Sequence, residues 1–89
     1  MTTTIKETTV GFLGGQVVPM ASMVFEGDYA LPDGSTGHGL ACVLVFGDDG
    51  GTWVGLGSVV TLGGERFECV DIRKERGQLG SVTMQALDA

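Results

Sequence analysis

The chain has few residues that could perform chemistry, and its single histidine, His38, is the first of them. His38 ends the segment DGSTGH, in which a Ser–His–acid arrangement could be drawn with Ser35 and Asp33. A catalytic triad depends on three-dimensional geometry, which closeness in sequence does not supply. Asp71 is a second carboxylate that could pair with His38, so a small hydrolase or isomerase stays open as one alternative. Without a nucleophile motif, the sequence favours a non-enzymatic protein, and we assign no catalytic residue.

Metal and cofactor sites have little support in the sequence. One histidine and two distant cysteines give neither a C-x-x-C nor an H-x-x-x-H spacing. GDDGG, at 47–51, lacks the alternating oxygen ligands of a calcium loop and is typical of a hairpin turn. The glycine-rich pieces GLGS and LGG precede no predicted helix, and a helix N-terminus is what gives phosphate loops their affinity. We therefore expect no metal and no cofactor.

The two cysteines, Cys42 and Cys69, lie within predicted strands. MTTTIKETTV, at the start of the chain, has no basic region followed by an apolar one, so we expect no signal peptide. The expected location is therefore cytoplasmic, and the expected thiols are free, buried and packed as small apolar groups. A disulfide between neighbouring strands is an open alternative.

Four consecutive charged residues, RKER at 73–76, stand out in a chain that is otherwise acidic. We interpret them as the solvated end of a hairpin, where basic side chains also discourage edge-to-edge strand pairing. A contact with an acidic ligand or partner is the alternative.

The elements that position these residues are expected to be strands. Sixteen glycines interrupt short β-branched and aromatic runs, and no window has an apolar period of 3.6 residues. The predicted strands cover 4–12, 20–30, 38–46, 52–56, 58–62, 65–72 and 81–87. We expect a single all-β domain over residues 1–89, a small antiparallel barrel or sandwich of six to seven strands.

Alternation within these runs predicts which side chains face the core. In the strand at 20–30 the odd-numbered side chains are expected inside, and the strand at 38–46, apolar on both faces, is expected to be central. LPDGSTG predicts a turn, because Asp33 can bond its own backbone and Gly34 accepts positive φ. At Cys69 and Val70 the alternation slips, which indicates either a β-bulge or cover on both faces.

Composition indicates self-association. Hydrophobic residues make up 43% of the chain and charged residues 18%, so a domain this small leaves apolar side chains on its surface. A homo-oligomer or a protein partner would cover them. The net charge of −6 opposes nucleic-acid binding. Because the longest apolar run, 40–46, has seven residues, we expect no membrane span.

Candidate contact residues are flexible or carry a polar group. Met20 and Met23, in VVPMASMVF, are predicted on opposite faces of one strand, and thioethers suit protein contacts. Tyr29 and Trp53 carry polar atoms on large apolar rings and suit a pocket or an interface rim. Together with His38 they could surround the mouth of a β-barrel that binds a small molecule.

The segment GLGSVVTLGGERFECVDI, within 55–72, has a glycine-led strand, a short turn and an aromatic-containing strand. Over about 55–87 the chain resembles the C-terminal half of small β-rich proteins of actinomycete bacteria, families without an assigned function. It is also similar to barrel hairpins of phage head–tail joining proteins. Neither resemblance implies a catalytic residue. The expected function is a non-enzymatic protein-binding or assembly module that self-associates through apolar strand faces, with the small-molecule-binding barrel and the His38 enzyme as alternatives.

Overall fold

The computed structural model describes residues 2–7, 9–13, 16–45, 51–62 and 64–87. Within these ranges the chain forms nine strands and no helix, so no helical membrane span occurs among them. The strands are β1 (Thr2–Lys6), β2 (Val10–Leu13), β3 (Gln16–Pro19), β4 (Phe25–Ala30), β5 (Thr36–Val45), β6 (Gly51–Gly55), β7 (Val59–Leu62), β8 (Glu65–Arg73) and β9 (Ser81–Ala86). The all-β prediction is confirmed. The predicted number of strands was too low.

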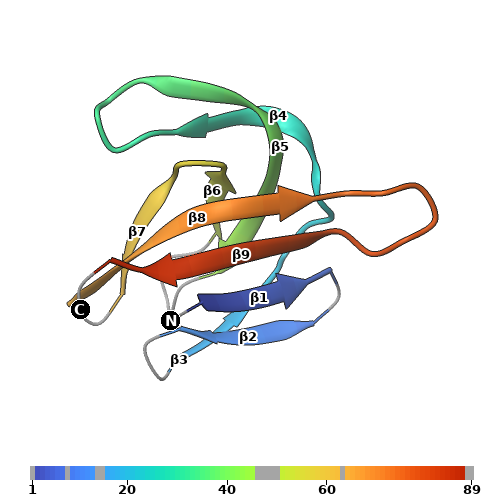
Figure 1. Ribbon diagram of the computed structural model, residues 1–89, viewed down its shortest axis with the longest axis horizontal. Helices are drawn as coiled ribbons and strands as arrows, with labels where there is room; N and C mark the ends of the chain where they lie inside the picture. Colours follow the sequence, from blue (N-terminus) through green and yellow to red (C-terminus); the bar gives the residue numbers. More distant parts are fainter. Residues whose placement is uncertain (1, 8, 14–15, 46–50, 63, 88–89) are drawn as a thin grey trace.

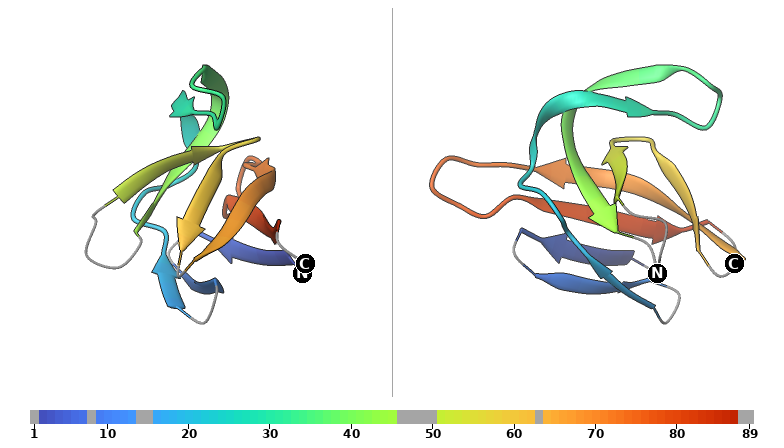
Figure 2. Two further views of the ribbon diagram at one scale, coloured as in Figure 1. Left: turned by 90° about the vertical axis from the view of Figure 1, so that its left-hand side faces the viewer. Right: turned by 180° about the vertical axis from the view of Figure 1, so that it is seen from behind.

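The strands form three antiparallel sheets, ordered β1-β9-β8-β7, β2-β3 and β4-β5-β6 (Figure 1). Two sets of backbone contacts tie the sheets together. The amide of Gly57 donates to the carbonyl of Cys69, and the amide of Ala21 donates to the carbonyl of Val43. These links do not close a barrel among the described strands. The sheets instead fold around one core from three sides, while the β4–β5 and β8–β9 hairpins project beyond it (Figure 2).

The core is apolar and is shared by all three sheets. Its fully buried members include Ile5 of β1, Val18 of β3, Leu44 of β5 and Met84 of β9. β5 lies between β4 and β6, as the apolar run at 38–46 predicted. Burying side chains from every sheet in one cluster is what holds three small sheets together, since a two-stranded hairpin is marginal alone.

Two predicted strands are divided in the structure. The predicted strand at 4–12 breaks because the amide and hydroxyl of Thr9 both donate to the carbonyl of Lys6, which turns the chain between β1 and β2. The predicted strand at 20–30 begins as a strand only at Phe25. Before it, Met20 bridges to Leu44. β3 was missed because LGG was expected only to end a strand, whereas β3, which pairs with β2, begins directly after it.

The prediction that odd-numbered side chains of this strand face the core is wrong. Within β4, Phe25 and Tyr29 lie on the face opposite to the main core. Before β4 the alternation itself fails. Met20 and Val24 are buried, whereas Met23 is 61% exposed. The reason is that 21–24 is not a regular strand, so period-two alternation does not apply there. Met20 therefore belongs to the core and Met23 lies outside it.

The slip in β8 is a β-bulge between Cys69 and Asp71. Cys69 is buried, Val70 turns outward, and Ile72 packs against the core beyond the bulge. The predicted turn after β4 also forms. There the amide of Ser35 donates to Asp33 Oδ1 over 2.9 Å, and Gly34 has a φ of 88°.

Candidate functional site

Tyr29 and Trp53, two of the predicted contact residues, lie on the same sheet. Trp53 is on β6 and is 47% exposed, while Tyr29 on β4 is nearly buried. Phe25 meets the indole edge-on, with ring centroids 5.0 Å apart and planes at 79°. The sheet therefore carries a small aromatic cluster on the face opposite to the main core.

Glycines make room for these rings. A Cβ on Gly27 would lie 3.1 Å from the Trp53 ring. A Cβ on Gly37 would lie 2.5 Å from the Tyr29 ring, and one on Gly55 would overlap that ring. The aromatic side chains thus lie flat against bare backbone, the arrangement by which aromatic residues compensate for glycine in sheets. Neither ring can shift inward.

A shallow pocket of about 430 Å³ opens beside the two rings. It is lined by Asp28, Tyr29, Ala30, Thr36, Thr52 and Trp53. Its walls are thus two aromatic residues, with two threonines, an alanine and one acidic residue, Asp28, around them. This composition suits a ligand with an apolar body and few polar atoms.

His38 does not meet the carboxylates proposed for it. Its Nδ1 lies 2.6 Å from Asp28 Oδ1, directly across the β4–β5 ladder, and both side chains are about 70% exposed. This carboxylate raises the pKa of His38. Asp33 instead binds Ser35, and Asp71 accepts from Arg73 Nε. Since alternation places His38 and Tyr29 on opposite faces of the sheet, His38 does not join the aromatic cluster.

Among the described residues, no nucleophilic side chain is hydrogen-bonded to the pair of His38 and Asp28. Its exposure also leaves the imidazole in water, where a catalytic base gains little from its surroundings. The arrangement therefore gives no support to the alternative of a His38 enzyme. Asp28 was missed because the register of the hairpin, which places it opposite His38, is fixed by the turn.

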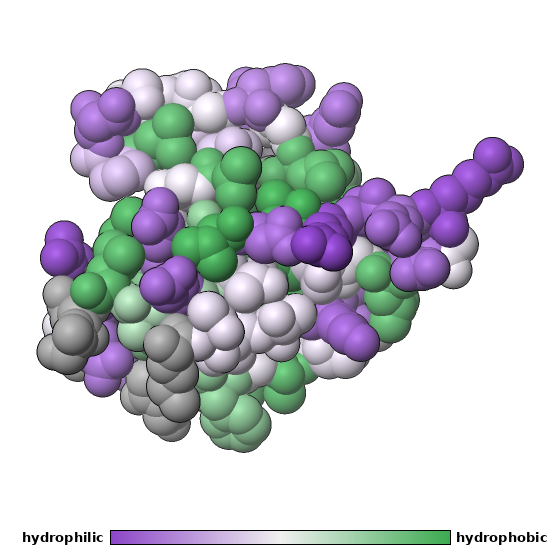
Figure 3. All heavy atoms as spheres, viewed as in Figure 1, coloured by the Kyte–Doolittle hydropathy of each residue, from purple (hydrophilic) through white to green (hydrophobic). Residues whose placement is uncertain are grey.

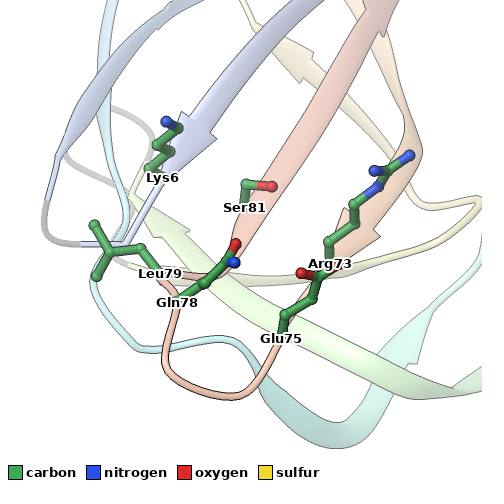
Figure 4. Close-up of a pocket in the computed structure, with 6 residues that line it drawn as sticks. All are labelled: Lys6, Arg73, Glu75, Gln78, Leu79 and Ser81. Carbon is green, nitrogen blue, oxygen red and sulfur yellow. The ribbon is translucent and has the colours of Figure 1, made fainter.

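The β8–β9 loop borders a second pocket, shown in Figure 4. It is lined by Lys6, Arg73, Glu75, Gln78, Leu79 and Ser81. Ser81 lies between Lys6 and Arg73 because the three residues are direct partners on β1, β9 and β8. Arg73 is engaged by Asp71, and Glu75 adds a carboxylate to the lining. Mixed charge of this kind favours no particular ligand.

The RKER run is more than a solvated end. Lys74 is half-buried, and its Nζ lies 2.7 Å and 2.9 Å from the two carboxylate oxygens of Glu7, which is 1% exposed. Glu7 also accepts from the amides of Val24 and Gly80, over 2.6 Å and 2.9 Å. The Lys74 ammonium and these amides lower the pKa of Glu7 to about 2. For Lys74 the sequence interpretation is wrong, whereas the other three residues of the run are exposed.

Glu7 is the residue that sequence reasoning missed. It joins the end of β1 to the connection before β4 and to the β8–β9 loop, three segments far apart in sequence. A fully paired carboxylate with so low a pKa stays ionised and is unsuited to proton transfer. Its role is therefore to anchor the three segments.

Cys42 and Cys69 are free and buried, as expected. Burial raises the pKa of Cys42 to about 12 and that of Cys69 to about 11. Thiols of this kind are poor nucleophiles. No group of three or more potential metal ligands occurs within the described ranges, and Asp48 and Asp49 of GDDGG lie outside them.

The outer side of the β2–β3 hairpin is apolar. Phe12 faces Val17 and Val10 faces Pro19 as direct cross-strand partners, so all four side chains share one side. Val10, Phe12 and Val17 are 54%, 64% and 53% exposed. We call these four residues the hairpin face. Apolar atoms gather in this region along the lower edge of the molecule in Figure 3.

Six other large apolar side chains are exposed among the described residues. They are Met23, Trp53, Leu56, Val70, Leu79 and Leu87. The expectation from composition, that a domain of this size leaves apolar side chains outside its core, is confirmed by these residues and the hairpin face.

No protein-family model, no curated protein and no solved structure matches this chain.

Proposed function

We propose that this chain is a non-enzymatic assembly module that associates with a second copy of itself through the hairpin face. The observation that carries the proposal is the set of three large apolar side chains, Val10, Phe12 and Val17, each more than half exposed on one small hairpin. Contiguous apolar surface of this kind marks interaction sites on soluble domains. Met23 is exposed elsewhere, and Met20 is in the core, so Met20 takes no part.

Charge supports a second copy as the partner. Residues 8–25, which contain the hairpin, have no charged side chain, although the chain carries a net charge of −6. Two copies repel each other over most of their surfaces. They can approach most closely where neither carries charge, which is at the hairpin face.

The gain in free energy fits a weak dimer. Fully burying a valine or phenylalanine side chain is worth about 1.5–3 kcal/mol, so completing the burial of half-exposed ones is worth about 1–2 kcal/mol each. Six such side chains in a symmetric pair contribute roughly 6–12 kcal/mol, against an association cost of about 4–15 kcal/mol. We therefore expect a dissociation constant of micromolar order or weaker.

Sedimentation velocity over a concentration series, from micromolar to millimolar, tests the proposal. The mean mass should rise from one chain towards two. High salt should strengthen the association, because it screens the repulsion between two acidic chains while leaving apolar contacts intact. Association that weakens with salt would point to pairing of the RKER segment at 73–76 with acidic surfaces. A monomer at all concentrations would overturn the proposal.

The resemblance to phage head–tail joining proteins agrees with an assembly role. This resemblance and the one to small actinomycete proteins both stay predictions. A cytoplasmic location likewise stays a prediction.

A further inference from the structure

The Trp53 indole is a preformed surface that the proposed self-association does not use. Phe25 packs against the ring in a T-shaped pair, and the backbone of Gly27 lies so close that a Cβ there would be 3.1 Å from the ring. The ring is nevertheless 47% exposed. Because its surroundings fix its orientation, a ligand that stacks on it loses little conformational freedom of the protein.

The pocket beside the indole has a second aromatic wall. Tyr29 is 9% exposed and packs against the bare backbone of Gly37 and Gly55. Thr36 and Thr52 also line the pocket. A volume of about 430 Å³ accommodates a small organic molecule rather than a bare ion.

The permanently charged side chains of the sheet that holds this pocket are all acidic. Between Lys6 and Arg66 the chain has no lysine or arginine. The β4-β5-β6 sheet therefore carries acidic side chains without a permanent base, and Asp28 itself borders the pocket. His38, the one basic group on the sheet, is bonded to Asp28. An anion would be repelled here, and a cation attracted.

We propose that the pocket of Trp53 and Tyr29 binds an organic ammonium cation, with the charged group over the exposed face of the indole. Tryptophan is the best aromatic partner for a cation, and desolvated ammonium groups on aromatic walls gain most. The apolar substituents of the cation fill the space beside Tyr29. The inference is independent of the hairpin face, so either proposal can fail while the other stands.

Trp53 is the only tryptophan of the chain, so its fluorescence reports on this pocket alone. Choline and its uncharged analogue 3,3-dimethylbutan-1-ol have the same shape and differ in charge. Choline should change the fluorescence and bind roughly 3- to 30-fold more tightly than the analogue, which is the range of cation–π interactions. Equal binding of the two compounds would show that the pocket recognises apolar shape and not charge. Failure of choline to bind would show that the pocket is not an ammonium site. Either result overturns the proposal.

Two charge variants test whether choline binds at the pocket of Trp53 and Tyr29. Asp28→Asn should weaken choline binding about threefold, the effect of a neighbouring charge in a largely aqueous setting. Glu65→Gln is the matched control, because Glu65 is an exposed carboxylate on β8 in another sheet, and it should leave binding unchanged. Equal losses in the two variants would show that only the net charge matters, and would overturn the assignment to this pocket. These comparisons need no change to Trp53, so they hold even if a Trp53→Leu variant does not fold.

The same assay can distinguish two sources of the ammonium group, a free metabolite and a side chain of a polypeptide. A free metabolite is represented by choline, and a side chain of a polypeptide by N-acetyl-lysine amide, with N-acetyl-norleucine amide as its uncharged control. If the lysine derivative binds more tightly than choline and its control does not bind, the natural cation is part of a polypeptide. The reverse order indicates a free quaternary ammonium compound.

Discussion

Replacing Phe12 with threonine should abolish most of the proposed self-association. Phe12 is 64% exposed in one chain, so docking can still remove about two thirds of its surface from water. With full burial of such a side chain worth about 3 kcal/mol, each copy would lose about 1–2 kcal/mol. A symmetric dimer contains the residue twice, so the loss is about 2–4 kcal/mol, or roughly 30- to 700-fold in the dissociation constant. Threonine is chosen because it retains a high preference for strands.

The assay is sedimentation of wild type and variant over the same concentration range. Leu56→Thr is the matched control, because Leu56 is 54% exposed and lies outside the hairpin face. Its dissociation constant should stay within about twofold of the wild type, as for a site with no shared contacts. Phe12→Thr should alter the free energy of unfolding by no more than about 1 kcal/mol, the worth of its cross-strand pair with Val17. If both variants weaken association equally, or neither does, the hairpin face is not the interface.

Three further outcomes test the packing. The pKa of Glu7 is about 2 in the folded chain and 4.5 in a model compound. Its ionised form therefore stabilises the fold above about pH 4.5, and this contribution is lost as the pH falls towards 2. Glu7→Gln should be less stable than wild type at pH 7, and the difference in melting temperature should shrink as the pH falls from 4.5 to 2. Gly55→Ala should lower the free energy of unfolding by about 1–3 kcal/mol through its overlap with Tyr29, and a double-mutant cycle with Tyr29→Ala should remove most of that loss. Cys42 and Cys69 should react with a thiol reagent in the native protein at least about 100-fold more slowly than in denaturant, measured by absorbance.

Short-range patterns predicted those parts of the fold that depend on neighbouring residues. The bulge at Cys69 and Asp71 follows from a slip in alternation, and the turn at Asp33 and Gly34 from side-chain and backbone preferences. The central place of β5 follows from its apolar character on both faces. In each case the physical cause lies within a few residues of its effect.

The anchor at Glu7 could not be predicted in this way. Its partners Val24, Lys74 and Gly80 are separated from it by 17 to 73 residues, and charge alone suggested an exposed position for Lys74. A lysine can lie half-buried once a carboxylate neutralises it, and that compensation is visible only in three dimensions. The same limit applies to Asp28 and His38, which meet through strand register.

β5 and the β2–β3 hairpin both need apolar side chains covered on two faces. Within the described residues, only β5 receives that cover from its own chain. Both have apolar side chains on two faces, a pattern typical of strands covered on both sides. On β5 the main core covers one face, while Phe25, Tyr29 and Trp53 from its neighbours cover the other. On the hairpin Leu13 and Val18 enter the core, but Phe12 and its neighbours stay exposed. A surface that has the composition of an interior, carries no charge and lacks cover within one copy is best covered by a second.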